Sequence, residues 1–174
     1  MKVRKSFLLV ILTIFVFLVS GCSSITQAGK EKTASFKDST GRIVSIKAKP
    51  QRIVSLTLGT DEILLDLVEP ERIAALTYLA DDQGISFATD KSRLVKSKIR
   101  SNSAEEILAL KPDLVLIADW WGLDMLQTLR DMGVPVYVYK TPYTVSDIKN
   151  TIREVGRVVG EPQRAENVID GFDD

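Results

Sequence analysis

The sequence predicts an α/β fold, a parallel sheet with helices on both faces, from three observations. Short apolar runs alternate with helical patterns along most of the chain, and strands separated by helices are typical of βαβ units. The run Leu114–Ile117 is apolar throughout, as strands buried on both faces are. A late segment has apolar residues 4, 3 and 4 positions apart, at Ile148, Ile152, Val155 and Val159, which is one face of an α-helix.

The first predicted elements are a hairpin, two strands and the helix between those strands. The hairpin spans residues 36–47 and turns at a polar stretch between two β-prone runs. A strand at Ile53–Leu56 follows, and Thr60 is predicted to be the N-cap of a helix that runs to Leu67. The strand Arg72–Leu76 completes the first βαβ unit.

The later elements continue the alternation after a polar excursion at residues 78–102, which contains a basic stretch and for which we predict no regular element. They are a helix at Ser103–Leu110, a strand at Leu114–Ile117, a helix at Leu123–Asp131, a strand at Val136–Tyr139 and a helix capped by Ser146. Ser103 and Ser146 mark two of the predicted helix starts, and Gly133 marks the end of the helix at Leu123–Asp131.

The N-terminus has the pattern of an export signal. Lys2, Arg4 and Lys5 precede the apolar run Phe7–Val19, which is broken only by Thr13. Thirteen residues are too few for a membrane span, which needs about 20, and fit the core of a signal peptide. We therefore predict a signal peptide at residues 1–21; a short N-terminal anchor helix is the alternative.

A lipidation site is predicted directly after this segment. Val19-Ser20-Gly21-Cys22 resembles the lipobox of bacterial lipoproteins, and Cys22 is the only cysteine in the chain. Cleavage before Cys22 would free it to carry lipid, and more than one acyl chain gives stable membrane anchoring. Residues 22–35 begin with small and polar side chains and are predicted to be a tether, so the protein is expected to be anchored to the extracytoplasmic face of the cell membrane.

Composition excludes several classes of function. The chain has no histidine, so it cannot form a Ser-His or Cys-His catalytic pair or an imidazole-based metal site. It has no Walker A sequence and no G-x-G-x-x-G. Removal of residues 1–21 takes away three of 23 basic residues and none of 23 acidic ones. The remaining net charge of about −3 argues against nucleic acid as a partner.

The candidate ligand site follows from the strand order. Ligands of open parallel sheets bind beyond the carboxyl ends of the strands, and both tryptophans and two of the four tyrosines directly follow predicted strands. Aromatic rings there suit a broad, partly apolar ligand whose orientation is fixed by hydroxyl and indole N–H groups. The residues predicted to bind this ligand are Thr57, Tyr78, Asp119, Trp120, Trp121 and Tyr143.

Simpler roles remain open for some of these residues. Trp120 and Trp121 could merely cover the end of the core, because large aromatic side chains are common at core edges. Asp81 and Asp82 could hold a hard cation, but paired acidic residues in a polar loop more often face solvent. We therefore predict no metal site.

Six segments form a recognisable pattern: Asp38–Arg42, Lys49–Leu56, Thr60–Leu65, Ser103–Leu116, Met132–Val136, and Val155–Gly156 with Gly160–Pro162. Together they resemble the binding proteins of ABC importers for ferric siderophores, haem and cobalamin. The resemblance covers residues 36–174 and is most specific between residues 105 and 116.

This resemblance implies a non-enzymatic, solute-binding lipoprotein that delivers a ferric chelate or a corrinoid to an ABC permease and holds no cofactor of its own. Such proteins have two α/β lobes joined by a long helix, with the chelate between the lobes. Residues 36–160 correspond to the N-terminal lobe, and residues 161–174 to the start of the interlobe helix. The candidate rim is aromatic and poor in arginine, which points away from catecholates.

Glu105 is the position that matches the acidic residue with which these families dock onto permease arginines. Ser103 and Glu106 have the spacing of a capping box, in which Glu106 folds back onto the backbone N–H of Ser103. Glu105 is then left free to point outward. Its alternative role is to stabilise the helix dipole, and Glu62, also near a helix start, ranks lower as a docking residue.

The chain departs from the family pattern at its end. Pro162 suits a helix start, but the chain stops soon afterwards without a visible partner for the apolar stripe at Ala165, Val168, Ile169 and Phe172. An apolar helix face that packs against no other element does not stabilise the helix. We therefore expect that the sequence is shortened by a truncated gene, by a frameshift or by deliberate cutting. The alternatives are a lone lobe that pairs with another chain, a surface lipoprotein that acts as an interaction module, and an enzyme on the same fold.

Overall fold

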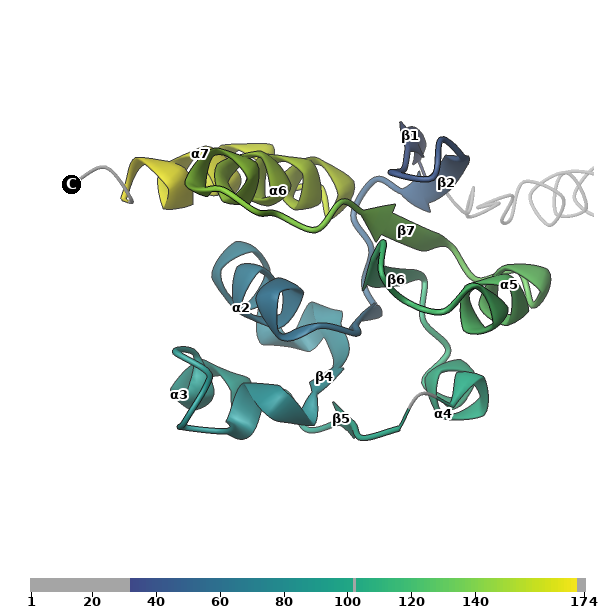
Figure 1. Cartoon of the computed structure of the whole chain (residues 1–174), viewed down its shortest axis with the longest axis horizontal. Coiled ribbons are helices and arrows are strands. Elements are labelled where there is room, and N and C mark those ends of the chain that lie inside the picture. The colour runs from purple at the N-terminus through teal and green to yellow at the C-terminus, as the bar shows by residue number, and fades with distance from the viewer. Residues whose placement is uncertain (1–31, 102, 172–174) are drawn as a thin grey trace, which may run out of the picture. The chain divides into compact units, whose positions relative to one another are not determined.

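The computed structural model describes residues 32–101 and 103–171 (Figure 1). The predicted signal peptide, Cys22 and Phe172 lie outside the described residues. Within them, five parallel strands form a sheet in the order β5-β4-β3-β6-β7. These strands are β3 (Ile53–Ser55), β4 (Ile73–Thr77), β5 (Lys98–Ile99), β6 (Leu114–Ala118) and β7 (Val136–Tyr139). The predicted α/β fold is confirmed.

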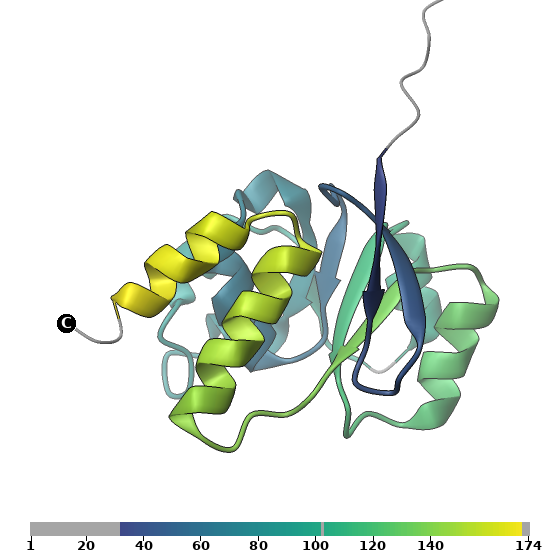
Figure 2. The ribbon, with the colours of Figure 1, turned by 90° about the horizontal axis from the view of Figure 1, so that it is seen from above.

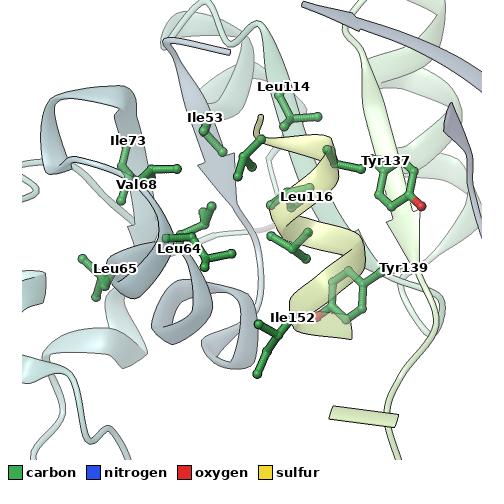
Figure 3. Close-up of a cluster of buried hydrophobic side chains, with 14 of the residues drawn as sticks. Ile53, Leu64, Leu65, Val68, Ile73, Leu114, Leu116, Tyr137, Tyr139 and Ile152 are labelled. Atoms are coloured by element: carbon green, nitrogen blue, oxygen red, sulfur yellow. The ribbon is translucent and has the colours of Figure 1, made fainter. Parts of the chain in front are cut away.

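Helices cover both faces of this sheet, as the sequence predicted. One face packs against α2 (Leu58–Leu67), α6 (Val145–Val158) and α7 (Pro162–Asp170). The other packs against α4 (Ala104–Ala109) and α5 (Leu123–Asp131). Every residue of β6 is buried, because this strand contributes Leu114 and Leu116 to one cluster and Val115 and Ile117 to the other. Figure 3 shows the first cluster, in which Leu64 lies among Ile53, Leu116 and Ile152.

The predicted hairpin is confirmed and starts earlier than expected. Strands β1 (Thr33–Lys37) and β2 (Ile43–Lys47) pair antiparallel, so the end of the predicted tether is strand. The Asp38 carboxylate accepts hydrogen bonds from the Thr40 and Arg42 N–H groups and pairs with Arg130 of α5 at 2.8 Å. The hairpin lies beside α6 and α7 over the same face of the sheet (Figure 2).

Two helices begin at different caps from those predicted. Thr57, and not Thr60, is the N-cap of α2, whereas the Thr60 side chain is buried. Thr144, and not Ser146, is the N-cap of α6, and it forms a reciprocal capping box with Asp147. In both cases the predicted cap lies inside the first turn of the helix. An N-cap residue has extended backbone, and the spacing of the sequence alone does not show which of two nearby hydroxyl residues has it.

The predicted polar excursion contains ordered elements that the sequence did not reveal. They are η2 (Tyr78–Asp81, a 3₁₀ helix), α3 (Thr89–Ser92) and the edge strand β5, and a further 3₁₀ helix, η1 (Pro70–Arg72), precedes β4. Strand β5 has only two residues and pairs parallel with Leu76 and Thr77 of β4. A strand this short carries no readable alternation pattern. Its position fixes the next residue, Arg100, at the edge of the sheet.

The apolar stripe of α7 does have a partner, contrary to the expectation from the sequence. Ala165 and Ile169 are buried in the core cluster that contains α2 and α6. Gly156 of α6 allows the close approach, because a Cβ atom there would lie 2.4 Å from Cβ of Ala165. Pro162 opens the helix as predicted. Among the described residues, no helix is both long enough and apolar enough to span a membrane.

Candidate functional site

The carboxyl ends of the strands surround a hollow of about 470 Å³. We call it the aromatic hollow. The residues after β3, β4, β5 and β6 line it together, as expected for the carboxyl edge of a parallel sheet. Its lining residues are Leu56, Thr57, Leu58, Gly59, Thr77, Tyr78, Leu79, Ile99, Arg100, Ser101, Trp120, Trp121, Tyr139, Thr141 and Pro142.

The two tryptophans form a stacked pair in this hollow. Their ring centroids are 5.5 Å apart and their planes differ by 23°. Trp121 packs against both core clusters, whereas Trp120 is 65% exposed. The buried Nε1–H group of Trp121 has no hydrogen-bond partner among the described residues. Stacking on the packed Trp121 ring therefore holds the Trp120 ring in place. The other face of Trp120 is open to a ligand.

Arg100 and Tyr78 form the opposite pair of the lining. The Arg100 guanidinium carbon lies 5.7 Å from the centroid of the Tyr78 ring, which is cation–π geometry. The Arg100 charge also acts on Asp81, where it helps to lower the pKa, but no described residue accepts a hydrogen bond from the guanidinium, so its N–H donors can bind a ligand. Arg100 was not predicted at this rim, because β5 was missed, and Arg100 is the one arginine among the lining residues.

Hydroxyl groups line the inner wall of the hollow. Thr57 Oγ1 lies 2.5 Å from the Tyr139 hydroxyl and 2.8 Å from Thr60 Oγ1. Thr60 Oγ1 lies 2.7 Å from Ser55 Oγ. Burial is the main cause that raises the pKa of Tyr139. This chain of hydroxyls connects the hollow to the first turn of α2.

Asp61 lies behind this wall and is fully buried. Its carboxyl accepts hydrogen bonds from the Thr77 N–H group at 3.1 Å and from the Thr77 hydroxyl, and it also interacts with Ser55. Burial raises the pKa of Asp61 from 3.8 to about 7 against the opposite effect of these hydrogen bonds. Sequence reasoning missed Asp61, because nothing in the spacing distinguishes a buried carboxyl from an exposed one in a helical first turn.

Two of the six predicted ligand residues lie outside the hollow. Asp119 Oδ1 accepts hydrogen bonds from the Thr141 N–H group at 3.2 Å and from its hydroxyl at 2.6 Å. The Thr141 hydroxyl lowers the pKa of Asp119. Tyr143 is 84% exposed. The structure thus brings together Thr57, Tyr78, Trp120 and Trp121, while Asp119 holds the loop after β7.

A second depression, the apolar groove, adjoins the aromatic hollow. It has a volume of about 590 Å³, lies among α2, α3, α6 and α7, and shares Gly59 and Pro142 with the hollow. Glu62 stands at this groove and accepts a hydrogen bond from the Phe87 N–H group at 2.9 Å. That bond fixes the segment before α3.

The acidic first turn of α4 differs from the predicted capping box. The Ser103 side chain accepts from the Glu106 N–H group, which confirms the N-cap. The Glu106 carboxylate, however, accepts from the Ser101 hydroxyl, and the Glu105 carboxylate accepts from the Ser103 hydroxyl, both at 2.6 Å. That bond lowers the pKa of Glu105, so this exposed side chain carries a negative charge at neutral pH.

The described acidic residues form no cluster of three or more ligands that could hold a metal ion. Asp81 pairs with Lys98 at 3.2 Å and accepts a hydrogen bond from Ser92. Asp82 instead accepts from the Gly84 N–H group. The two carboxylates are thus bound to different partners.

The chain is similar to known proteins of one family. Residues 53–174 match a family model described as periplasmic binding protein. The chain is 25% identical over 163 residues to the uncharacterized ABC transporter substrate-binding lipoprotein YvrC of Bacillus subtilis, covering 87% of this chain and 50% of that one. It is 27% identical over 127 residues to the vitamin B12-binding protein of Vibrio parahaemolyticus, covering 70% and 43%.

Solved structures show the same fold. The haem binding protein HmuT superposes with a TM-score of 0.66 at 23% identity, covering 80% of this chain and 44% of that one. Unliganded FhuD2 from Staphylococcus aureus superposes with a TM-score of 0.65 at 22% identity, covering 80% and 47%. The chain spans about half the length of the curated relatives it matches.

Proposed function

The chain belongs to the periplasmic binding protein family, and from that premise we propose that it binds a ferric chelate or a corrinoid for an ABC importer. The family and the substrate-binding relatives support a transport role rather than an enzymatic one. We propose further that the protein is exported and that lipid on Cys22 anchors it to the membrane. The similar protein YvrC of Bacillus subtilis is described as a lipoprotein, which supports this.

The aromatic hollow is the observation that carries the proposal. The open face of Trp120 suits the apolar surface of a large ring or chelate. Arg100 supplies N–H donors and a positive charge at the other side of the hollow, which suits a ligand with carboxylate, phosphate or catecholate oxygens. A ligand held between these two groups would be fixed by stacking and oriented by charge.

Delivery of the ligand requires contact with a membrane permease. Glu105 is exposed and ionised at the start of α4, and Ser101 and Arg100, just before it in the chain, line the aromatic hollow. A carboxylate near the ligand site suits a cationic patch on the permease, because charge complementarity at a rim orients the encounter. We propose Glu105 as the docking residue of this lobe.

Calorimetric titration of the full chain with cyanocobalamin, haemin and a ferric tris-catecholate tests ligand binding. We expect one of these probes to bind, and Trp120→Ala to weaken its binding about 5- to 50-fold, as for loss of one aromatic contact. Tyr143→Ala is the control, because it removes another exposed aromatic side chain that does not line the hollow. Equal losses in both variants, or no binding of any probe, would count against the hollow as the ligand site.

The stand-alone interaction module remains the second candidate. It predicts that the chain captures no chelate at all yet stays folded and monomeric. The same titrations decide between the two, and the intact mass of the membrane-extracted protein decides whether Cys22 carries lipid.

A further inference from the structure

A buried carboxyl stands directly behind the wall of the aromatic hollow. Thr77 lines the hollow, and both its N–H group and its hydroxyl bind Asp61. Thr57 and Tyr139 line the hollow too, and their hydroxyls connect through Thr60 to Ser55, which contributes to lowering the pKa of Asp61. One wall residue, Thr77, is therefore bound directly to a carboxyl that is itself fully buried.

We propose that Asp61 is a positioning residue whose protonation state sets the hydrogen-bonding polarity of the ligand site, an inference that rests on the proposed role of the aromatic hollow. A threonine hydroxyl has one hydrogen to donate. When Asp61 is ionised, Thr77 must give that hydrogen to the carboxylate, and only its lone pairs are left for other partners. When Asp61 is neutral, its own proton can be donated to Thr77, which frees the hydroxyl hydrogen.

The charge of Asp61 acts in the same direction as this change at Thr77. A buried carboxylate beside the wall repels an anion in the hollow, whereas a neutral carboxyl does not. The hydroxyls of Ser55 and Thr60 also have the Thr57 carbonyl as an acceptor, at 3.2 and 3.1 Å, so Thr77 is the wall residue through which Asp61 acts on a ligand. The hollow should therefore take an anionic group more tightly when Asp61 is neutral.

No cationic side chain neutralises Asp61 among the described residues. The titratable groups that act on it or feel its charge are Glu62 beside it on α2 and Tyr139 on β7. Charged groups on the other elements that pack against α2 have partners of their own. They are Asp81 of η2 with Lys98, Lys91 of α3 with Asp66, Asp147 of α6 in its capping box, and Arg164 of α7 with Glu69.

Quenching of tryptophan fluorescence tests the proposal without a natural ligand, because the only two tryptophans of the chain line the hollow. The probes are iodide, an anion, and acrylamide, which is neutral. In the full chain we expect iodide quenching to fall about twofold as pH rises, since a nearby negative charge repels the anion. The midpoint should lie near the pKa of Asp61, about 7. Acrylamide quenching should stay constant.

Asp61→Asn should remove the pH dependence of iodide quenching, because its amide stays neutral. Thr77→Val should reduce it, whereas Asp66→Asn, on the same helix but paired with Lys91, should leave it in place. The proposal is overturned if Asp61→Asn keeps the midpoint, or if acrylamide shows the same pH profile, which would indicate a change of shape. Failure of every chelate to bind would contradict the proposed function, while the quenching profiles would still decide the role of Asp61.

Discussion

At the scale of single residues, Asp61 links stability to pH. Its pKa is 3.8 when solvated and about 7 in the fold, because burial penalises the charged form. The folded state therefore binds more protons than the unfolded state between these values, and stability falls as pH rises from about 4 to 7. Above pH 7, the charge costs up to roughly 4 kcal/mol relative to the neutral carboxyl.

We expect Asp61→Asn to be more stable than the natural chain at pH 8 and close to it at pH 5. The amide can keep the hydrogen bonds to Thr77 and carries no charge to bury. Urea unfolding at the two pH values measures the difference. A stability gap that does not grow with pH would show that Asp61 is already neutral, or already paired, throughout this range.

The site residues show which signals the sequence carries at this scale. The positions of Trp120, Trp121 and Tyr78 in the ligand site were predictable, because each residue follows a strand that is recognisable from a run of apolar residues. Arg100 was not, since it follows a two-residue strand. Asp61 was not either, because its function depends on depth in the fold and on Thr77, which is distant in sequence.

At the scale of secondary structure, the cap of α6 gives a prediction with an internal control. Thr144 accepts from the Asp147 N–H group at 3.1 Å, so Thr144→Ala should cost about 1 kcal/mol of stability. Ser146→Ala, two residues later inside the helix, should change stability by less than about 0.5 kcal/mol. Thermal unfolding of both variants decides; equal effects would contradict the assignment of the cap.

The contact between α6 and α7 gives a second prediction at this scale. Gly156→Ala places a methyl group 2.4 Å from Ala165 Cβ and 3.2 Å from the Glu161 carbonyl, and such overpacking costs about 1–3 kcal/mol. Gly59→Ala, in the first turn of α2 with nothing within 4 Å of the added group, should instead add up to about 1 kcal/mol. Denaturant midpoints that move in the same direction would refute this account of the packing.

Elements were predictable where periodicity was long enough to read. The helix at α6 and the strand at β6 have clear apolar patterns, and both are confirmed. Short elements such as β5 and α3 are determined by tertiary contacts instead, because two to four residues carry no period. The burial of Ala165 and Ile169 against α2 and α6 likewise depends on how distant elements meet.

At the scale of the whole molecule, the ligand hollow and the proposed docking residue belong to neighbouring parts of one edge. Trp120 and Arg100 line the hollow, and α4 begins only four residues after Arg100. Binding and delivery can therefore be separated by mutation, because Glu105 is exposed and does not line the hollow.

Glu105→Ala should reduce uptake of the bound chelate by cells while leaving its affinity for the purified protein unchanged. The physical reason is the loss of a rim charge, which slows productive encounter with a cationic partner surface and makes it less dependent on salt. Glu106→Ala is the matched control, because Glu106 is adjacent in the same helical turn but bonds Ser101. Radiolabelled uptake and calorimetry on the same variants give the comparison. If uptake falls equally in both, general damage to α4 explains the loss; if it falls in neither, Glu105 serves only the helix dipole.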